Sequence, residues 1–356
     1  MLGKIILDLP PKENNPRNSE GAFLKLTDGT IMFAYSRFRG NHGGDDMDAD
    51  IVALYSNDNG ETFGALKVLF TKEELNAKNI MSVSMLRIDD DTIAIFYMVR
   101  MGFHDLRAVI RLSKDEGRTF TDARYCINYP GYFVVNNDRI IQLTNGRILI
   151  PAAYHRCIGP DPFAWKSFSG KGVARFFYSD DLGKTYHETP DFGSLNVSSG
   201  TGLQEPGIVE IEDGHLFCYA RTDLGCQYTS HSYDFGMTWE PFVPSQFASP
   251  VSPMSIKKLP GKDIYIAIYN PIPALTDKPK YGWGRTPLIL KTSTDGCKTF
   301  KGDMVLEDDP ESGYCYTAMY FTEDALLLAY CAGGPDDGGC LNRLRIRKIP
   351  LNQICP

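Results

Sequence analysis

A short motif with the pattern Ser-x-Asp-x-Gly-x-Thr-aromatic recurs along the chain and limits the folds that the chain can adopt. Four copies are complete, and in a fifth Cys297 takes the place of the glycine. The copies lie at Ser56–Phe63, Ser113–Phe120, Ser179–Tyr186, Ser232–Trp239 and Ser293–Phe300. The first and last copies are four intervals apart, which gives about 59 residues per interval. A fixed period marks one structural unit, and six units of this size fill nearly all of the 356 residues.

Hairpin turns form a second repeat that runs alongside the first. Asn-Gly and Asp-Gly are the strongest short hairpin signals, because those residues accept positive φ. The six turns are Asp28-Gly29, Asp90-Asp91, Asn145-Gly146, Asp213-Gly214, Gly261-Lys262 and Glu323-Asp324, each followed by an alternating or wholly apolar stretch. Six hairpins and five motifs predict an all-β chain folded as a single six-bladed β-propeller over residues 1–356. Residues Lys4–Asp8 are expected to pair beside Asn342–Ile349, which closes the ring and removes exposed sheet edges.

The repeated motif, called the Asp box, is expected to be structural. Its Asp and Ser side chains can hydrogen-bond backbone groups in their own turn, and its glycine supplies positive φ. The terminal aromatic ring is expected to fill the gap between neighbouring sheets. A calcium site is the functional alternative, but one Asp per box gives too few oxygen ligands. We therefore expect the boxes to fasten the blades and to take no part in chemistry.

Charge and cysteine content exclude several classes of partner. The formal charge of −7 argues against nucleic acid and anionic membranes, and no apolar run approaches the length of a transmembrane helix. Nine cysteines without a C-x-x-C pair indicate reduced thiols. The N-terminus lacks the apolar run of a signal peptide, so a cytoplasmic protein is expected, or a secreted one if a signal was removed. No His/Cys cluster has the spacing of metal ligands, and neither a metal nor an organic cofactor is predicted.

One face of the predicted propeller is expected to carry the function. If the six turns lie on one face, the start of each first strand and the end of each second strand lie on the other, around the channel mouth. Arginines mixed with acids and tyrosines suggest a ligand that is anionic, hydroxylated or both, although each residue alone is more often a solvated or turn-forming group. The polar residues at these positions are Arg17, Glu20, Arg37, Arg39, Asp45, Asp46, Arg100, His104, Asn137, Asp138, Arg139, His155, Glu205, Arg221, Asn270, Arg285, Tyr314 and Tyr316.

The segment from Gln204 to Gly214, running on to Ala220-Arg221, resembles the sialidases. It reads Gln-Glu-Pro-Gly-Ile-Val-Glu-Ile-Glu-Asp-Gly and is similar to a sialidase segment in which a Glu precedes Val-Val-Glu-Leu, a turn, a strand and an Arg. In that family the Glu partners a nucleophilic tyrosine, and the Arg belongs to a cluster of three that binds the substrate carboxylate. The resemblance implies these roles for Glu205 and Arg221.

Two later segments extend the resemblance. Gly284-Arg285, ahead of a strand and the fifth box, looks like the segment that carries another arginine of the cluster. Gly313–Met319 precedes the last hairpin, where the family places Tyr-Ser before a similar strand. Tyr316, which a hydroxyl residue follows, is the better match for the nucleophile. Tyr314 is the alternative, because the following turn is about one residue shorter than usual.

The first repeat unit matches the family in one part and departs from it in another. Arg39 and Asp45 have the family's spacing for a binding arginine and the acid/base aspartate, with Arg37 and Asp46 as close competitors. Sialidases begin with an Arg-Ile-Pro motif that supplies the first arginine of the cluster. Alignment on the first hairpin turn puts Ser19 or Glu20 near that place, with Arg17 about two residues early. A glutamate there would repel a carboxylate and could instead bind sugar hydroxyls.

The run Asn136-Asn137-Asp138-Arg139 also departs from the small, Gly-rich segment that the family has there. The resemblance as a whole implies an exo-acting, retaining glycoside hydrolase of the sialidase type, acting on a terminal, acidic, sialic-acid-like sugar of a glycan or small glycoside. Tyr316 would be the nucleophile, Glu205 its base and Asp45 the acid/base. Two alternatives remain. One is a propeller that cleaves uronic-acid or other glycans, using His155 or His104, and the other is a non-catalytic glycan-binding propeller.

Overall fold

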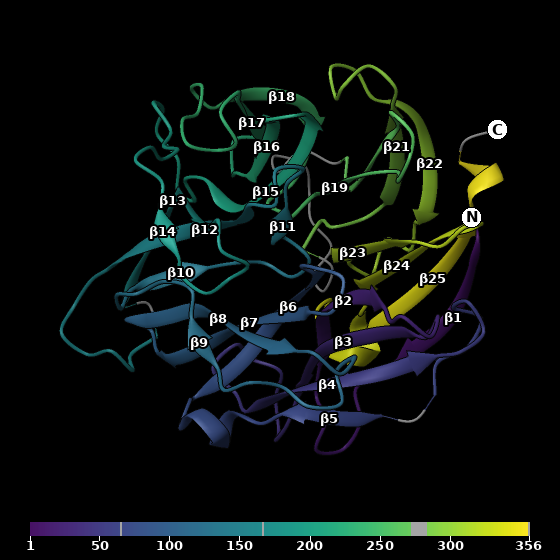
Figure 1. Ribbon diagram of the computed structural model, residues 1–356, viewed down its shortest axis with the longest axis horizontal. Coiled ribbons are helices and arrows are strands. Elements are labelled where there is room, and N and C mark those ends of the chain that lie inside the picture. Colours follow the sequence, from purple (N-terminus) through teal and green to yellow (C-terminus); the bar gives the residue numbers. More distant parts are fainter. Residues whose placement is uncertain (65, 166, 272–282, 355–356) are drawn as a thin grey trace.

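The structure, a computed structural model, describes residues 1–64, 66–165, 167–271 and 283–354. Strands make up most of its regular structure, which confirms the predicted all-β class (Figure 1). Three short 3₁₀ helices are also present in the described ranges: η1 (Lys72–Leu75), η2 (Pro335–Asp337) and η3 (Leu351–Gln353). Within the same ranges, no helix is long and apolar enough to cross a membrane.

Four of the sheets have four antiparallel strands each. The first holds β2 (Asn18–Lys25), β3 (Ile31–Phe38), β4 (Ala49–Ser56) and β5 (Lys67–Phe70). The second holds β15 (Gln204–Glu212), β16 (His215–Arg221), β17 (Cys226–Ser232) and β18 (Val243–Ala248), and the third β19 (Ser255–Lys258), β20 (Tyr265–Tyr269), β21 (Leu288–Ser293) and β22 (Lys301–Glu307). The fourth has the order β1 (Lys4–Leu9), β25 (Leu344–Pro350), β24 (Ala325–Cys331) and β23 (Cys315–Phe321).

A fifth sheet is formed by two antiparallel groups joined at one point. One group holds β6 (Asn79–Arg87), β7 (Ile93–Gly102), β8 (Asp105–Ser113) and β9 (Arg124–Tyr125). The other holds β10 (Tyr132–Val134), β11 (Ile141–Gln142), β12 (Ile148–Cys157), β13 (Phe168–Ser179) and β14 (His187–Glu188). The joint is a parallel pairing of Tyr132 with Leu106. The hydrogen-bonded sheets of the described residues therefore number five, and the closed ring of six blades stays a prediction.

The predicted turns and the predicted terminal pairing both lie where the sequence puts them. The six turns connect β2–β3, β6–β7, β11–β12, β15–β16, β19–β20 and β23–β24, and each pair is antiparallel. Strand β1 pairs with β25, with Lys4 opposite Lys348. The two ends of the chain are thus held in one sheet, as expected.

The Asp boxes are hydrogen-bonded turns, as the sequence predicts. In the first box the Ser56 hydroxyl donates to Asp58 Oδ1 (2.8 Å) and accepts from the Gly60 backbone N–H (2.8 Å), while Asp58 also accepts from the Thr62 N–H (2.9 Å). Hydrogen bonds from Thr62 lower the pKa of Asp58 to about 2. The fifth box keeps the geometry although Cys297 must adopt a φ of 65°. No group of three or more metal-ligating side chains occurs among the residues that the structure describes.

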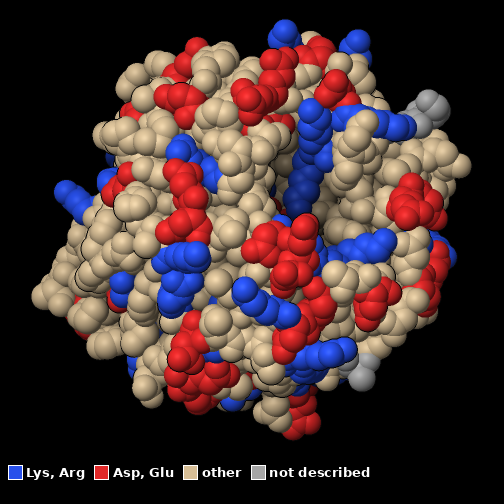
Figure 2. Space-filling view, in the orientation of Figure 1, with Lys and Arg blue, Asp and Glu red and all other residues tan. Residues whose placement is uncertain are grey.

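The hydrophobic cores lie between neighbouring sheets. Phe33 and Val52 of the first sheet pack with Leu327 and Ala329 of β24, and the other sheets meet their neighbours in the same way. Because the apolar side chains lie between sheets, polar residues are left for the middle of the molecule. Figure 2 shows a hollow there on one face, with basic side chains along one wall near β19 and acidic side chains beside it.

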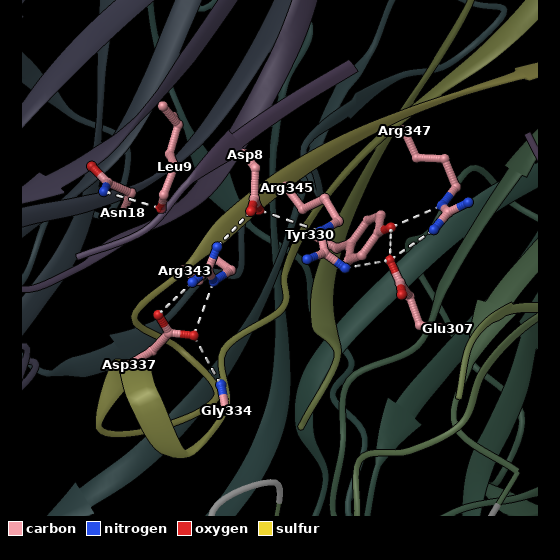
Figure 3. Close-up of polar contacts among 10 residues, drawn as sticks. All are labelled: Asp8, Leu9, Asn18, Glu307, Tyr330, Gly334, Asp337, Arg343, Arg345 and Arg347. Carbon is pink, nitrogen blue, oxygen red and sulfur yellow. Dashed lines mark hydrogen bonds and ion pairs between the residues drawn. The ribbon is translucent and has the colours of Figure 1, made fainter. Parts of the chain in front are cut away.

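A polar network also joins the last two sheets along the chain (Figure 3). Glu307 Oε1, at the end of β22, accepts hydrogen bonds from the Tyr330 hydroxyl (2.6 Å), Arg345 Nη1 (2.8 Å) and Arg347 Nη2 (2.8 Å). Arg345 also reaches Asp8 of β1 (3.3 Å). The network links β22, β24, β25 and β1, so charged groups as well as apolar packing fasten the chain ends.

Candidate active site

One pocket, with a volume of about 210 Å³, gathers many of the polar residues that the sequence predicts around the channel. Its polar lining consists of Glu20, Asp45, Ser82, Arg100, Tyr132, Asn136, His155, Gln204, Glu205, Arg221 and Tyr316, and its apolar lining of Met81, Met98, Leu106, Val134 and Phe168. These residues come from the first, second, fourth and fifth sheets and from the loop between β3 and β4. The volume is below the ~300 Å³ of most small-molecule sites. The pocket therefore suits one small cyclic group.

A larger hollow of about 710 Å³ lies beside the same loop, at Gly43 and Gly44. Its lining includes His42, Trp283 and Asp337. None of the predicted site residues lines it. The smaller pocket is therefore the candidate active site.

Four side chains reach the smaller pocket from distorted positions in the innermost strands. Glu20, Ser82, Glu205 and Tyr316 have φ of 58°, 58°, 48° and 57°. Each lies at an irregularity in the register of its strand, in β2, β6, β15 and β23. Such bulges re-aim a side chain, and a left-handed non-glycine residue costs about 1–3 kcal/mol. The same local distortion, repeated in four strands, thus turns these side chains into one pocket.

Tyr316, Glu205 and Arg221 are in direct contact. The Tyr316 hydroxyl donates to Glu205 Oε1 (2.9 Å), and Arg221 Nη1 donates to Glu205 Oε2 (2.8 Å). Burial, together with the neighbouring carboxylate of Glu205, raises the pKa of Tyr316 well above its ordinary value. The phenol is therefore protonated at neutral pH and has a hydrogen-bond acceptor in place.

The predicted alternative, Tyr314, lies elsewhere. It is 2% exposed, its ring is 6.5 Å from that of Tyr330, and it is not among the pocket residues. Burial raises the pKa of Tyr314 to about 12. Of the two tyrosines, the geometry favours Tyr316.

Arg17 holds two acids at one edge of the pocket. Its Nη1 donates to Asp45 Oδ1 (2.6 Å) and to the Gly43 carbonyl (3.1 Å), its Nε donates to the Ser19 hydroxyl (2.8 Å), and its Nη2 pairs with Glu20. Glu20 also accepts from the Ser82 hydroxyl. Arg17 is 1% exposed and is not a lining residue, whereas Glu20 is. The structure thus answers the question left by the sequence, because the glutamate enters the pocket.

The two acids held by Arg17 titrate in opposite directions. Burial raises the pKa of Glu20 to about 7, despite the nearby guanidinium. Burial also opposes ionisation of Asp45, but the charge of Arg17 outweighs it and lowers the pKa of Asp45. The Asp45 side chain is 42% exposed and lies at the solvent side. At neutral pH the pocket therefore holds an ionised Asp45 beside a partly protonated Glu20.

Arg285 lies next to the pocket without lining it. It is 4% exposed, its Nη1 donates to Cys315 Sγ (3.1 Å) and its Nη2 to the Val251 carbonyl (3.3 Å). Its guanidinium carbon is 5.6 Å from the centre of the Tyr316 ring. Arg285 therefore supports Tyr316 from behind.

Arg37, Arg39 and Asp46 lie outside the pocket. Arg39 pairs with Asp50 (2.9 Å) and Glu73 (2.9 Å) at the protein surface. Asp46 lines a neighbouring hollow of about 220 Å³, which shares Arg100 with the pocket. Arg37 lies on β3 opposite residues of β2 and β4. Of the competing pairs that the sequence offered in the first unit, only Asp45 reaches the pocket.

The run Asn137-Asp138-Arg139 is engaged in contacts across the middle of the molecule. Asn137 Nδ2 donates to the carbonyls of Gly21 (2.9 Å) and Tyr316 (3.2 Å). Asp138 accepts from Lys257 Nζ (2.6 Å), and Arg139 donates to the Tyr219 hydroxyl (2.8 Å). None of the three lines the pocket. Their contacts hold the inner strands in position.

His155 does line the pocket. Its Nδ1 is 2.8 Å from the Ser169 carbonyl, and burial lowers its pKa, so the imidazole is neutral at pH 7. His104 contacts the Ser167 carbonyl (3.0 Å) and is not a lining residue. Only one of the two predicted histidines is therefore placed for chemistry.

Several pocket residues escaped the sequence interpretation. Ser82, Tyr132 and Phe168 carry no motif, and Arg100 belonged only to the wider set of channel residues. Asn136 stood in the run that departs from the family, but it was not a predicted site residue. The rings of Tyr132 and Phe168 stack with centroids 4.1 Å apart, and Arg100 Nη1 donates to the Tyr132 hydroxyl (2.8 Å). Tyr132 and Phe168 come from short or late parts of the fifth sheet, where no repeat signal marks them.

Comparison with known proteins places this geometry in a family. The family model described as "BNR repeat-like domain" matches residues 29–328. The anhydrosialidase of Macrobdella decora is 31% identical over 156 residues, covering 40% of this chain and 19% of that protein. The matched part thus spans about a fifth of this curated relative.

Solved structures show a similar fold. A Hadza microbial sialidase superposes with a TM-score of 0.74 at 17% identity, covering 96% of this chain and 67% of that one. The leech intramolecular trans-sialidase, in complex with 2,7-anhydro-Neu5Ac, gives 0.73 at 16% identity, covering 99% and 71%. A protein of unknown function from Dyadobacter fermentans gives 0.70 at 17% identity, covering 97% and 99%. The family match shows that the chain belongs to the family of the BNR repeat-like domain, and the solved structures show that it shares their fold.

Proposed function

We propose that the protein is a retaining glycoside hydrolase that removes one terminal sugar, with Tyr316 as nucleophile, Glu205 as its base and Asp45 as acid/base. The observation that carries the proposal is the contact between the Tyr316 hydroxyl and Glu205 (2.9 Å) inside a pocket of about 210 Å³. A tyrosine nucleophile is the known exception to the two-carboxylate scheme of glycosidases. Family membership supports a sialidase-type reaction.

In the first step the Tyr316 oxygen attacks the anomeric carbon while its proton passes to Glu205. A free phenol has a pKa near ~10, so it needs an adjacent base at neutral pH. The bond to the leaving oxygen breaks, and Asp45 gives that oxygen a proton. The product of this step is a sugar linked to the tyrosine oxygen.

In the second step a water molecule loses a proton to Asp45 and attacks the anomeric carbon. The tyrosine oxygen leaves and takes back its proton from Glu205. Because the pKa of Asp45 is lowered, the free protein holds it ionised, ready for this second step. Protonation of Asp45 for the first step requires acidic pH or a change on substrate binding. Aryl leaving groups of low pKa avoid this requirement.

The small volume supports exo action, because one sugar unit fills the pocket. Arg221 fixes Glu205 through its ion pair (2.8 Å), and Arg100 remains as a donor for sugar oxygens. The neutral His155 donates its Nδ1–H to the Ser169 carbonyl, so its Nε2 is left as an acceptor for a sugar hydroxyl. We also propose that the whole chain, residues 1–356, is a single six-bladed propeller domain. The two antiparallel groups of the fifth sheet, joined by one parallel pairing, would be two of the six blades.

Hydrolysis of a panel of aryl glycosides by wild type and by the Tyr316→Phe variant tests the proposal. We expect measurable turnover in wild type, retention of anomeric configuration by NMR, and loss of turnover in the folded variant. Asp45→Ala should impair alkyl glycosides far more than activated aryl glycosides. Undiminished turnover by Tyr316→Phe would refute the mechanism. An unsaturated sugar product would instead support the elimination alternative with His155 as base.

A further inference from the structure

The pocket carries more acidic than basic groups. Glu20, Asp45 and Glu205 line it, against the guanidinium groups of Arg100 and Arg221. His155 adds no charge at neutral pH, because burial lowers its pKa. The lining alone has a formal charge of −1 when all three carboxyl groups are ionised, and the guanidinium of Arg17, which pairs with Glu20 and Asp45 from behind the lining, balances it. The ionised acids and these arginines therefore cancel, and the arginines that touch the acids are already paired rather than free for an anionic ligand.

Two of the three arginines nearest to the family's cluster do not line the pocket. Arg17 pairs with both Glu20 and Asp45 and is not among the lining residues. Arg285 contacts Cys315 (3.1 Å) and is not among them either. Arginines bind a carboxylate strongly when the planar fork of N–H groups faces it. Neither guanidinium faces the pocket.

The third arginine is already paired. Arg221 Nη1 donates to Glu205 Oε2 (2.8 Å), and the two side chains are 15% and 10% exposed. A substrate carboxylate at Arg221 would have to compete with Glu205, the base that the reaction needs. The site that would hold a carboxylate in the family's arrangement is therefore absent from the described pocket.

The apolar part of the lining comes from the fifth sheet. It consists of Met81, Met98, Leu106, Val134 and Phe168. A sugar ring presents hydroxyl groups at its edge and a carbon–hydrogen surface on its faces, so it matches a pocket lined by both polar and apolar side chains. The carboxylate oxygens of Glu20 each hold further lone pairs beyond their contacts with Arg17 and Ser82. They can accept hydrogen bonds from sugar hydroxyls.

We infer that the reacting sugar is neutral: a polyhydroxylated monosaccharide without a carboxylate on its ring, with hydroxyls at Glu20 and Asp45 and its carbon face against Met81, Met98 and Phe168. The inference rests on the proposed function, since it names the substrate class of the same pocket. It departs from the acidic sugar that the resemblance implies. Glu20 is the residue that excludes the acid.

Binding measurements with a matched pair of ligands test the inference on the full chain. The probes are the methyl α-glycoside of N-acetylneuraminic acid and its methyl ester, which differ only in the charge of the carboxyl group, together with neutral hexoses, 6-deoxyhexoses and N-acetylhexosamines. Titration calorimetry should show at least one neutral probe binding 10-fold or more tightly than the acid. Tighter binding of the acid than of every neutral probe would overturn the inference. So would failure of every probe to bind at 10 mM.

A variant without the charge of Glu20 tests whether this residue excludes the acidic sugar. Glu20→Gln keeps the shape and a hydrogen-bonding group, and should narrow the ratio of acid to ester dissociation constants at least 5-fold by improving binding of the acid. Glu212→Gln, the same change at an exposed residue at the end of β15, should leave the ratio unchanged. A Glu20→Gln variant that binds the acid more weakly, or no better, would contradict the inference.

The inference and the proposed function can fail separately. Tyr316→Phe should keep the ligand preference of wild type while losing turnover. Retained turnover in this variant, with a preference for neutral ligands, would reject the mechanism and keep the neutral substrate class. Lost turnover with a preference for the acid would keep the mechanism and reject the neutral substrate class.

Discussion

Among the sets of Tyr, Glu and Arg in the described residues, one in the pocket and one buried between sheets share the same contacts. In the pocket, Tyr316 donates to Glu205 (2.9 Å), which pairs with Arg221 (2.8 Å). Between the last two sheets, Tyr330 donates to Glu307 (2.6 Å), which pairs with Arg347 (2.8 Å; Figure 3). Burial and the adjacent glutamate raise the pKa of both tyrosines. Residue types and distances alone do not separate the two sets.

Backbone conformation and surroundings do separate them. Tyr316 and Glu205 adopt positive φ at strand irregularities and line a pocket. Tyr330 is fully buried in regular pairing with Arg345 of β25, and Glu307 accepts a further hydrogen bond from Arg345. Tyr316 and Glu205 are held in a costly left-handed conformation that opens them to a ligand, whereas Tyr330 and Glu307 do not have a positive φ and join strands. Strain together with a pocket therefore distinguishes the set that we propose for chemistry.

Paired Tyr→Phe substitutions give the largest expected difference. Tyr316→Phe should lower turnover by about 10³-fold or more, because the covalent step loses its nucleophile. Tyr330→Phe should leave turnover per folded molecule unchanged and lower the free energy of unfolding by about 1–2 kcal/mol, the cost of lost buried hydrogen bonds. Kinetics on an aryl glycoside and denaturant unfolding of both variants measure the two effects. Equal loss of turnover in both would abolish the distinction.

Paired Glu→Gln substitutions should separate activity from stability. Glu205→Gln removes the base for Tyr316 and should cost about 10²-fold or more in turnover. Glu307→Gln removes the charge that faces Arg345 and Arg347, which are 18% and 2% exposed on their side chains, and should cost about 2 kcal/mol of stability or more. Turnover and urea midpoints test this. A stable Glu307→Gln variant would show that the network is dispensable.

The pH dependence of stability should differ in sign between Glu307 and Glu20. Burial opposes ionisation of Glu307, but its hydrogen bonds to Tyr330 and the arginines lower its pKa, so its stabilisation exists above about pH 4.5 and is lost as pH falls further. Burial raises the pKa of Glu20 to about 7, so its ionisation destabilises the folded state progressively between about pH 4.5 and 7. Urea unfolding of wild type, Glu307→Gln and Glu20→Gln across pH 3–8 measures both.

The stabilities of the two variants, each compared with wild type, should change in opposite directions as pH rises. The stability of Glu20→Gln relative to wild type should rise with pH between about 4.5 and 7, while that of Glu307→Gln should fall as pH rises through the acidic range. Parallel curves for the two variants would mean that the two carboxyl groups share one environment.

The smallest effect is expected at an Asp box. Asp58→Ala removes the acceptor for the Thr62 N–H and the Ser56 hydroxyl on the protein surface. It should lower the free energy of unfolding by about 1 kcal/mol and leave turnover unchanged. Thermal unfolding and the aryl glycoside assay check both. A large loss of turnover would show that the boxes do more than fasten strands.

Much of the fold could be predicted from the sequence because its signals are local. Asp-Gly and Asn-Gly turns, alternating strands and the Asp boxes each depend on a few neighbouring residues, and all of these are found at the expected places. The pairing of β1 with β25 followed from the need to cover sheet edges. Glu205 and Arg221 were found because they stand in a recognisable motif.

The choice between neighbouring residues needed the tertiary structure. Tyr314 and Tyr316, Arg17 and Glu20, and Asp45 and Asp46 are separated by one to three positions, and the sequence could not say which of each pair faces the pocket. In a regular strand, residues two apart share a face. The positive φ at Glu20 and Tyr316 breaks that alternation and turns those side chains inward.

The sequence by itself determined the all-β class, the repeats and the residue types available for chemistry, because short-range hydrogen bonding and strand alternation fix these locally. Only the tertiary structure decided which residues form the pocket and what its charge is. Arg17 pairs with the nearby Glu20 and also with Asp45, which is 28 residues away. Arg285 contacts Cys315, which is 30 residues away, and lies beside Tyr316. Such contacts depend on how strands from different sheets converge, which no local pattern records.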